Sequence, residues 1–95
     1  MNIQKSDIVI SSNGRDQNKP FFVLETDGEY ALIVDGKTRR LEKPKRKKLK
    51  HLRYTAAGDG SVAVKIQNGE EITNNELRRS LAEYSAGAAG VEGGM

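Results

Sequence analysis

Two Asp-Gly pairs, eight positions apart, constrain the fold of this chain more than any other feature. They separate the apolar runs of the stretch VLETDGEYALIVDGKTRRLE, at Asp27-Gly28 and Asp35-Gly36. Asp-Gly between two such runs is a preferred two-residue hairpin turn, because both central residues need positive φ. Two successive turns predict three adjacent antiparallel strands, a meander over roughly residues 20–26, 29–34 and 37–42.

One further short strand is expected on each side of this meander. Asp7–Ser11 is rich in β-branched residues and ends in Ser-Asn-Gly, where Gly14 can adopt positive φ. After the break at Lys43-Pro44 and the charged run KRKK, Leu49–Thr55 can form one more strand. Five short strands within about 50 residues favour a small closed or half-closed barrel, because closure removes exposed edges.

The core of this barrel has to be mainly aliphatic, because the chain has no Trp and few other aromatic residues. The sequence defines the strand register only to within one residue. The expected core residues are Ile8, Ile10, Phe22, Leu24, Leu32, Val34, Leu41, Leu49 and Leu52.

The chain after the barrel (residues 1–55) divides into three parts. Residues 56–72 are expected to be a linker in which 62–66 form a short strand or an extended segment. A helix is predicted over 73–85, because Thr73 and Glu76 form a capping box that Ile72 and Leu77 can support with a hydrophobic staple. Its apolar stripe is expected to dock on the barrel: Leu77, Leu81 and Tyr84. The Gly-rich tail, 86–95, is expected to be disordered.

Positive charge is concentrated in one stretch, residues 37–53 (KTRRLEKPKRKKLKHLR), which holds ten of the 16 Lys and Arg residues and one acidic residue, a net +9. The rest of the chain has six basic and twelve acidic residues, a net −6. Such a polarised field suits a polyanion, and binding that neutralises phosphates releases counterions. The alternatives are a solvated face or a targeting tag. Nucleic-acid binding is favoured because the charge lies on and between predicted strands and the remainder has the opposite sign.

The loop around Gly14, Arg15 and Asp16 has two interpretations that are compatible. It is a tight turn closed by an Arg–Asp contact, or it brings the backbone close to a phosphate while Arg15 and Lys19 add charge. His51, the only histidine, has no nucleophile and carboxylate at recognisable spacing. We therefore expect it to form a hydrogen bond within the barrel or to stack on a base, and not to act in catalysis.

Several function classes are disfavoured by what the sequence lacks. With no Cys and one His, the chain offers no disulfide and no ordinary zinc site. No P-loop, paired carboxylates or nucleophile elbow is present, so we expect no enzyme, metal or cofactor. The longest apolar run, Tyr30–Val34, is too short to cross a membrane, and the N-terminus lacks the apolar core of a secretory signal. A cytoplasmic protein with no membrane partner is expected.

The stretch SDIVISSNGRDQNKPFFVLETDGEYALI resembles a KOW motif, and VDGKTRRLEKPKRKKLKHL resembles the small bacterial KOW-domain RNA-binding proteins. These are themselves similar to a large-subunit ribosomal protein of archaea and eukaryotes. The resemblance implies an SH3-like β-barrel that binds structured RNA, with ribosomal RNA as the expected ligand, and works in translation. The residues that match the family's pattern are Gly14, Arg15, Asp16, Arg39, Arg40, Pro44, Lys45, Lys48, Lys50 and His51.

The sequence thus predicts a mainly β protein with one short C-terminal helix. This protein is expected to bind RNA by recognising the backbone and shape of the RNA. The expected RNA-binding residues are Gly14, Arg15, Lys19, Arg39, Arg40, Lys43, Lys45, Arg46, Lys47, Lys48, Lys50, His51 and Arg53. If about five to eight of these charges reach phosphates, log K against log salt should have a slope of roughly −4 to −7. The alternative is a protein–protein adaptor of the translation or transcription machinery, in contact with ribosome or ribosome-assembly proteins through the barrel and helix. An adaptor should keep its partner after RNA digestion.

Overall fold

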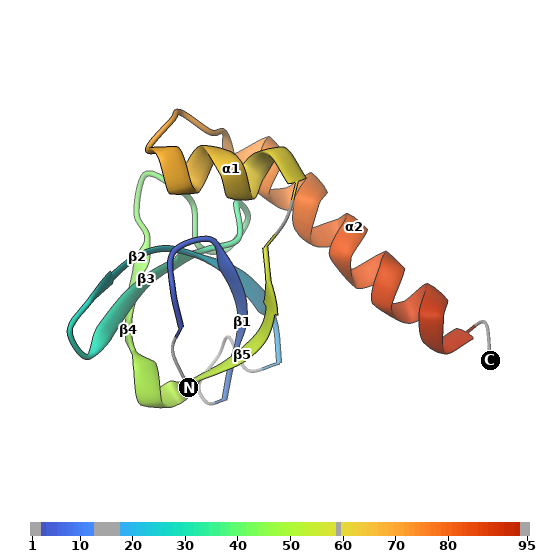
Figure 1. The fold of residues 1–95 in the computed structure, drawn as a ribbon, viewed down its shortest axis with the longest axis horizontal. Helices are drawn as coiled ribbons and strands as arrows, with labels where there is room; N and C mark the ends of the chain where they lie inside the picture. Colours follow the sequence, from blue (N-terminus) through green and yellow to red (C-terminus); the bar gives the residue numbers. More distant parts are fainter. Residues whose placement is uncertain (1–2, 13–17, 59, 94–95) are drawn as a thin grey trace.

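The computed structural model describes residues 3–12, 18–58 and 60–93, and for 86–93 the backbone alone. Figure 1 shows a curved sheet with two helices on one side, the second of which projects away from the body. The strands are β1 (Asp7–Ser11), β2 (Pro20–Asp27), β3 (Tyr30–Val34), β4 (Lys45–Lys48) and β5 (Leu52–Ala57). The 3-10 helix η1 (Leu49–His51) joins β4 to β5, and the α-helices are α1 (Gly60–Asn68) and α2 (Asn74–Gly93).

The sheet is strongly curled, because a short segment links its two edges. The strand order β4-β3-β2-β1-β5 makes β4 and β5 the edges, and all neighbours are antiparallel. Adjacent strands lie about 4.8 Å apart, so the edges of a flat five-stranded sheet would be separated by about 19 Å. η1 has three residues, and the four steps from Lys48 to Leu52 span about 14 Å even when fully extended. The edges must therefore approach each other at this end.

The mainly β architecture with five antiparallel strands is confirmed, and so is the first hairpin, although its turn lies one residue later than predicted. Asp27 pairs with Tyr30, so the two loop residues are Gly28 and Glu29. Of these two, Gly28 alone has a positive φ, of 60°. This is the φ pattern of a type II′ turn, which needs glycine at its first central position.

The predicted strand at 37–42 is wrong, and so is the second two-residue turn. The partner of β3 is β4, whose KRKK sequence has no apolar alternation that would predict a strand. Residues 35–42 form a loop that docks on the start of α2. The Leu41 N–H donates to Asn74 Oδ1 (2.8 Å), and the Arg78 guanidinium donates to the Gly36 carbonyl (2.7 Å). These contacts with a distant part of the chain replace the expected pairing with β3.

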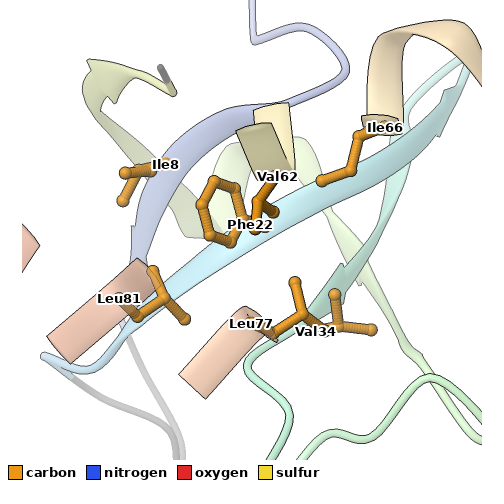
Figure 2. Close-up of a cluster of buried hydrophobic side chains, with 7 residues drawn as sticks. All are labelled: Ile8, Phe22, Val34, Val62, Ile66, Leu77 and Leu81. Atoms are coloured by element: carbon orange, nitrogen blue, oxygen red, sulfur yellow. The ribbon is translucent and has the colours of Figure 1, made fainter. Parts of the chain in front are cut away.

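Both faces of the sheet carry a buried cluster over β1 and the first half of β2, which explains the continuous apolar runs of these two strands. Figure 2 shows the cluster on the helical side, where side chains from three strands and both helices converge: Ile8, Phe22, Val34, Val62, Ile66, Leu77 and Leu81. The inner cluster, on the other face, contains Val9, Phe21, Val23, Ala31, Ile33 and Leu52. It has no member from either helix, so its burial depends on the curl of the sheet.

The core prediction is correct for the helical face, but of the buried inner cluster it includes only Leu52. Four of the predicted residues are buried: Ile8, Phe22, Val34 and Leu52. Three are half-buried and pack against the two clusters: Leu24, Leu41 and Leu49. The remaining two, Ile10 and Leu32, are half-buried. The rest of the inner cluster is missed because period-two alternation assigns one face of each strand to solvent, whereas here each face carries a buried cluster.

The segment 62–66 lies in α1 and is not extended as predicted. The β-branched residues favour a strand, but Val62, Ala63 and Ile66 share one helical face and are buried against the sheet. Tertiary burial of this face outweighs the local β preference. The described residues therefore form two α-helices where one is predicted.

The start of α2 is as predicted, and its end is not. The Thr73 N–H donates to Glu76 Oε2 (3.0 Å), and the Glu76 N–H donates to Thr73 Oγ1 (3.1 Å), which completes the capping box. The helix continues to Gly93, so the expected disordered tail is wrong over residues 86–93. Its alanines are strong helix formers that carry the helix past the glycines. Residues 94–95 lie outside the described residues.

We expect Gly36→Ala to destabilise the protein more than Gly28→Ala does. Both glycines have positive φ, which costs an L-residue about 1–2 kcal/mol. A Cβ at Gly36 would in addition overlap the backbone carbonyl of Asn74, whereas a Cβ at Gly28 meets nothing within 4 Å. Urea unfolding of the two variants measures the difference. Equal losses of unfolding free energy would contradict the close contact between this loop and α2.

Candidate nucleic-acid interface

The basic segment 37–53 occupies three successive parts of the fold. Residues 37–44 lie in the loop that docks on α2, residues 45–48 form β4 at one edge of the sheet, and residues 49–53 form η1 and the start of β5. The first part forms hydrogen bonds with α2, whereas the second and third parts line the curled end of the sheet.

The carboxylate of Asp35 organises the docked loop. It accepts hydrogen bonds from the Lys37 N–H (2.9 Å), the Thr38 hydroxyl (2.7 Å) and the Arg39 N–H (2.8 Å). Partial burial raises the pKa of Asp35, but these hydrogen bonds, that of Arg39 first, outweigh burial and hold the pKa below its ordinary value of 3.8. Asp35 is therefore a loop former and not a hairpin-turn residue.

Arg40 forms an ion pair within the docked loop, and Arg39 contributes to the loop through its backbone. Arg40 Nε lies 3.6 Å from Glu42 Oε2, and the Asn74 side chain donates to Glu42 Oε1 (2.7 Å). The hydrogen bond from Asn74 is the main cause that lowers the pKa of Glu42 from its ordinary 4.5. Arg39 is half-buried, and its carbonyl accepts from the N–H groups of Asp35 and Gly36. Several polar groups of the loop are thus used in hydrogen bonds and an ion pair within the loop itself.

Strand β4 presents cations on both of its faces. Lys45 and Lys47 are half-buried and lie opposite Ile33 and Ala31, on the face of the inner cluster. Arg46 and Lys48 are exposed and share the other face with Leu32 and Tyr30. As an edge strand, β4 has no neighbour on its outer side in the sheet.

The Tyr30 ring supports the exposed cations of β4. The Arg46 guanidinium carbon lies 3.6 Å from the ring centroid, and Lys48 Nζ lies 6.0 Å from it. A cation over a tyrosine face at an exposed site gains about 0.5–1 kcal/mol. Arg46 Nη2 is also 3.9 Å from Asp27 Oδ2, but both side chains are more than half exposed, so this ion pair contributes little. The ring holds Arg46 in place without neutralising it.

Backbone hydrogen bonds hold η1 at the curled end. The Leu49 N–H donates to the Glu29 carbonyl (2.8 Å), and the Ser12 N–H and hydroxyl both donate to the His51 carbonyl (2.9 Å each). Lys50 in η1 and Arg53 at the start of β5 are exposed, whereas the His51 side chain is half-buried. The cations of β4, η1 and the start of β5 are named the basic edge here: Lys45, Arg46, Lys47, Lys48, Lys50 and Arg53.

The other residues that the sequence predicts to bind RNA are not part of the basic edge. Gly14 and Arg15, with Asp16, lie outside the described residues. Lys19 is exposed just before β2, and it lines a hollow with Lys37 and Arg78 next to α2. Lys43 is exposed where the docked loop leads into β4, and Arg39 and Arg40 belong to the docked loop itself.

Two tyrosines beside the basic edge are missed by the sequence-based expectation. Tyr30 lies under Arg46, and Tyr54 lines a hollow with Lys50 and Arg53. Alternation along β5 could have indicated Tyr54, because it places Leu52 and Tyr54 on one face and Arg53 on the other. Tyr30 could not be paired with cations before β4 was known to be its neighbour.

Two kinds of feature are absent from the described part of the chain: a cluster of metal ligands and a helix that could span a membrane. Over residues 3–12, 18–58 and 60–93, no group of three or more His, Asp or Glu side chains is placed to hold a metal ion. Over the same ranges, no helix combines the length and apolar character needed to cross a membrane.

We expect the contribution of Asp35 to stability to disappear in acid. Its folded pKa lies below its ordinary value of 3.8, so its stabilising effect is complete above that value and is lost as the pH falls through the folded pKa. Urea unfolding of wild type and Asp35→Ala over a pH series measures this. The difference in unfolding free energy should be constant near neutrality and shrink below pH 3.8. A difference that is independent of pH would mean that the carboxylate charge does not hold the loop.

The chemistry of this surface has to be inferred from its own residues. Neither a known family model nor a curated protein matches the chain. The features available for that inference are the basic edge, the tyrosines beside it and the curled end of the sheet.

Proposed function

We propose that the protein binds structured RNA through the basic edge, and that it recognises the backbone and shape of the RNA. The observation that carries this proposal is the composition of β4, an edge strand made entirely of Lys and Arg. Its cations continue without an acidic residue through η1 to Arg53. Lysines meet phosphates as point charges, while arginines can pair with them bidentately.

The fixed geometry of these cations supports binding to a folded polyanion. β4 is paired with β3 along its whole length, and η1 is anchored by the carbonyl of Glu29 and by Ser12. Charges on a rigid element lose less conformational freedom on binding than charges on a flexible tail. The net −6 of the remaining chain orients the molecule so that this edge meets the RNA first.

We also propose that the curled sheet is an SH3-like barrel of the KOW type. The five short antiparallel strands and the burial of the inner cluster support this architecture. The resemblance of residues 1–55 to KOW-domain proteins then favours ribosomal RNA as the ligand, with a role in translation in the cytoplasm. Ribosome or ribosome-assembly proteins would be neighbours of the bound protein.

We expect the double variant Arg46→Gln/Lys48→Gln to lose most of its RNA affinity. Two lost phosphate contacts weaken binding by about 10- to 100-fold at 0.1 M salt and make the slope of log K against log salt less negative by roughly 1.5. A filter-binding titration at several salt concentrations, with a ribosomal RNA fragment, measures both quantities. The wild-type slope should be about −4 to −5 if about six cations reach phosphates.

The matched control is Lys37→Gln/Arg79→Gln, which removes two exposed cations outside the basic edge. It changes the net charge equally and should leave the affinity within a few-fold of wild type. Equal losses in both double variants would mean that net charge alone drives binding. A wild-type slope near zero would exclude the proposal, and a cellular partner that remains bound after nuclease treatment would favour the protein–protein adaptor.

A further inference from the structure

A shallow hollow of about 560 Å³ opens at the curled end of the sheet, beside the basic edge. This volume lies within the range of ordinary small-ligand sites. The residues that line it are Ile3, Leu49, Lys50, Leu52, Arg53 and Tyr54. The hollow thus combines an apolar floor, two cations and one aromatic ring, and its lining includes no carboxylate.

The floor of the hollow is continuous with the protein core. Leu52 belongs to the inner cluster, and Ile3 and Leu49 pack against that cluster. Because Leu49 is also held by its backbone hydrogen bond to Glu29, the floor is preformed. The rim is cationic, since Lys50 and Arg53 are both exposed.

Tyr54 is the most exposed of the described aromatic residues, with 40% of its surface accessible, whereas the two phenylalanines are fully buried. The register of β5 places it opposite Val9, on the inner face of the sheet. Tyr54 therefore lines the hollow beside its apolar floor and keeps accessible surface for a ligand. An aromatic face beside cations is the arrangement that proteins use to stack a nucleobase and hold its phosphates.

The second tyrosine of the surface is less suited to this role. Arg46 already covers the Tyr30 ring, and the hollow next to it is lined by the carboxylates of Glu25 and Asp27. Carboxylates repel the phosphates that flank a base. The Tyr54 hollow has the complementary charge for a nucleotide, and the Tyr30 hollow does not.

We infer that the Tyr54 hollow takes one unpaired nucleobase, which stacks on the Tyr54 ring while Lys50 and Arg53 bind the adjoining phosphates. This inference rests on the proposed RNA binding and names the class of RNA. A base within a continuous duplex is stacked on its neighbours and cannot enter, so the ligand is an RNA with a bulged or looped nucleotide beside a helix. The basic edge then holds the backbone of that helix.

Two RNA hairpins test the inference, one with a single bulged 2-aminopurine and one with the same stem fully paired. Wild type should bind the bulged hairpin more tightly, and the emission of 2-aminopurine should change as the base stacks. Tyr54→Ala should lose between about 5-fold and 150-fold in affinity for the bulged hairpin, the loss expected for one base–aromatic stack. Its affinity for the paired stem should not change.

Three further variants separate stacking from structure. Tyr54→Phe keeps the ring and should retain both the affinity and the emission change. Tyr54→Leu keeps apolar contact with the floor but has no aromatic face, so it should behave like Tyr54→Ala even if the alanine variant is unstable. Val64→Ala removes a second large apolar side chain that is exposed among the described residues, on α1, and should bind both hairpins as wild type does.

The outcomes distinguish this inference from the proposed function. If wild type binds both hairpins with a steep salt dependence and equal affinity, and Tyr54→Leu does the same, RNA binding stands and the base site is excluded. If Tyr54→Phe loses as much affinity as Tyr54→Leu, the hydroxyl acts and stacking does not. If wild type binds neither hairpin, the proposed function itself fails.

Discussion

A three-residue helix, η1, joins strands that lie at opposite edges of a five-stranded sheet. A flat sheet cannot accommodate so short a link, so the sheet curls. The curl buries the inner cluster without a contribution from α1 or α2, and it brings the all-cationic strand β4 next to the start of β5. Both the stability of the sheet and the continuity of the basic edge therefore depend on the same short connection.

The outer face of the sheet depends on a second long-range contact. Gly36 lies against the backbone of Asn74, and Leu41 and Glu42 bind the Asn74 side chain. This contact takes residues 35–42 away from β3 and leaves the place beside β3 open for β4. The basic run consequently forms part of the sheet. Its backbone is held by pairing, and alternate side chains reach both faces.

A strand made of Lys and Arg serves two purposes at the edge of a sheet. An unpaired edge offers its N–H and C=O groups to other chains, and charged side chains, lysine above all, prevent such pairing. The same charges attract a polyanion. Tyr30 and Tyr54 extend this surface on its two sides, one under a cation and one in a hollow with free ring surface. The protection of the edge and the proposed binding of RNA thus use the same residues.

The sequence alone determined the features that arise from neighbouring residues. These are the β2–β3 hairpin, the capping box at Thr73 and Glu76, the first strand and the concentration of cations, because turn chemistry, capping and charge act over a few positions. Only the tertiary structure decided which segment pairs with β3, that α1 is a helix, that each sheet face carries a buried cluster and that Tyr54 lines a hollow with an apolar floor. Each of these follows from contacts between distant segments, such as Gly36 with Asn74, whose energies exceed local preferences and leave no trace in a short window of sequence.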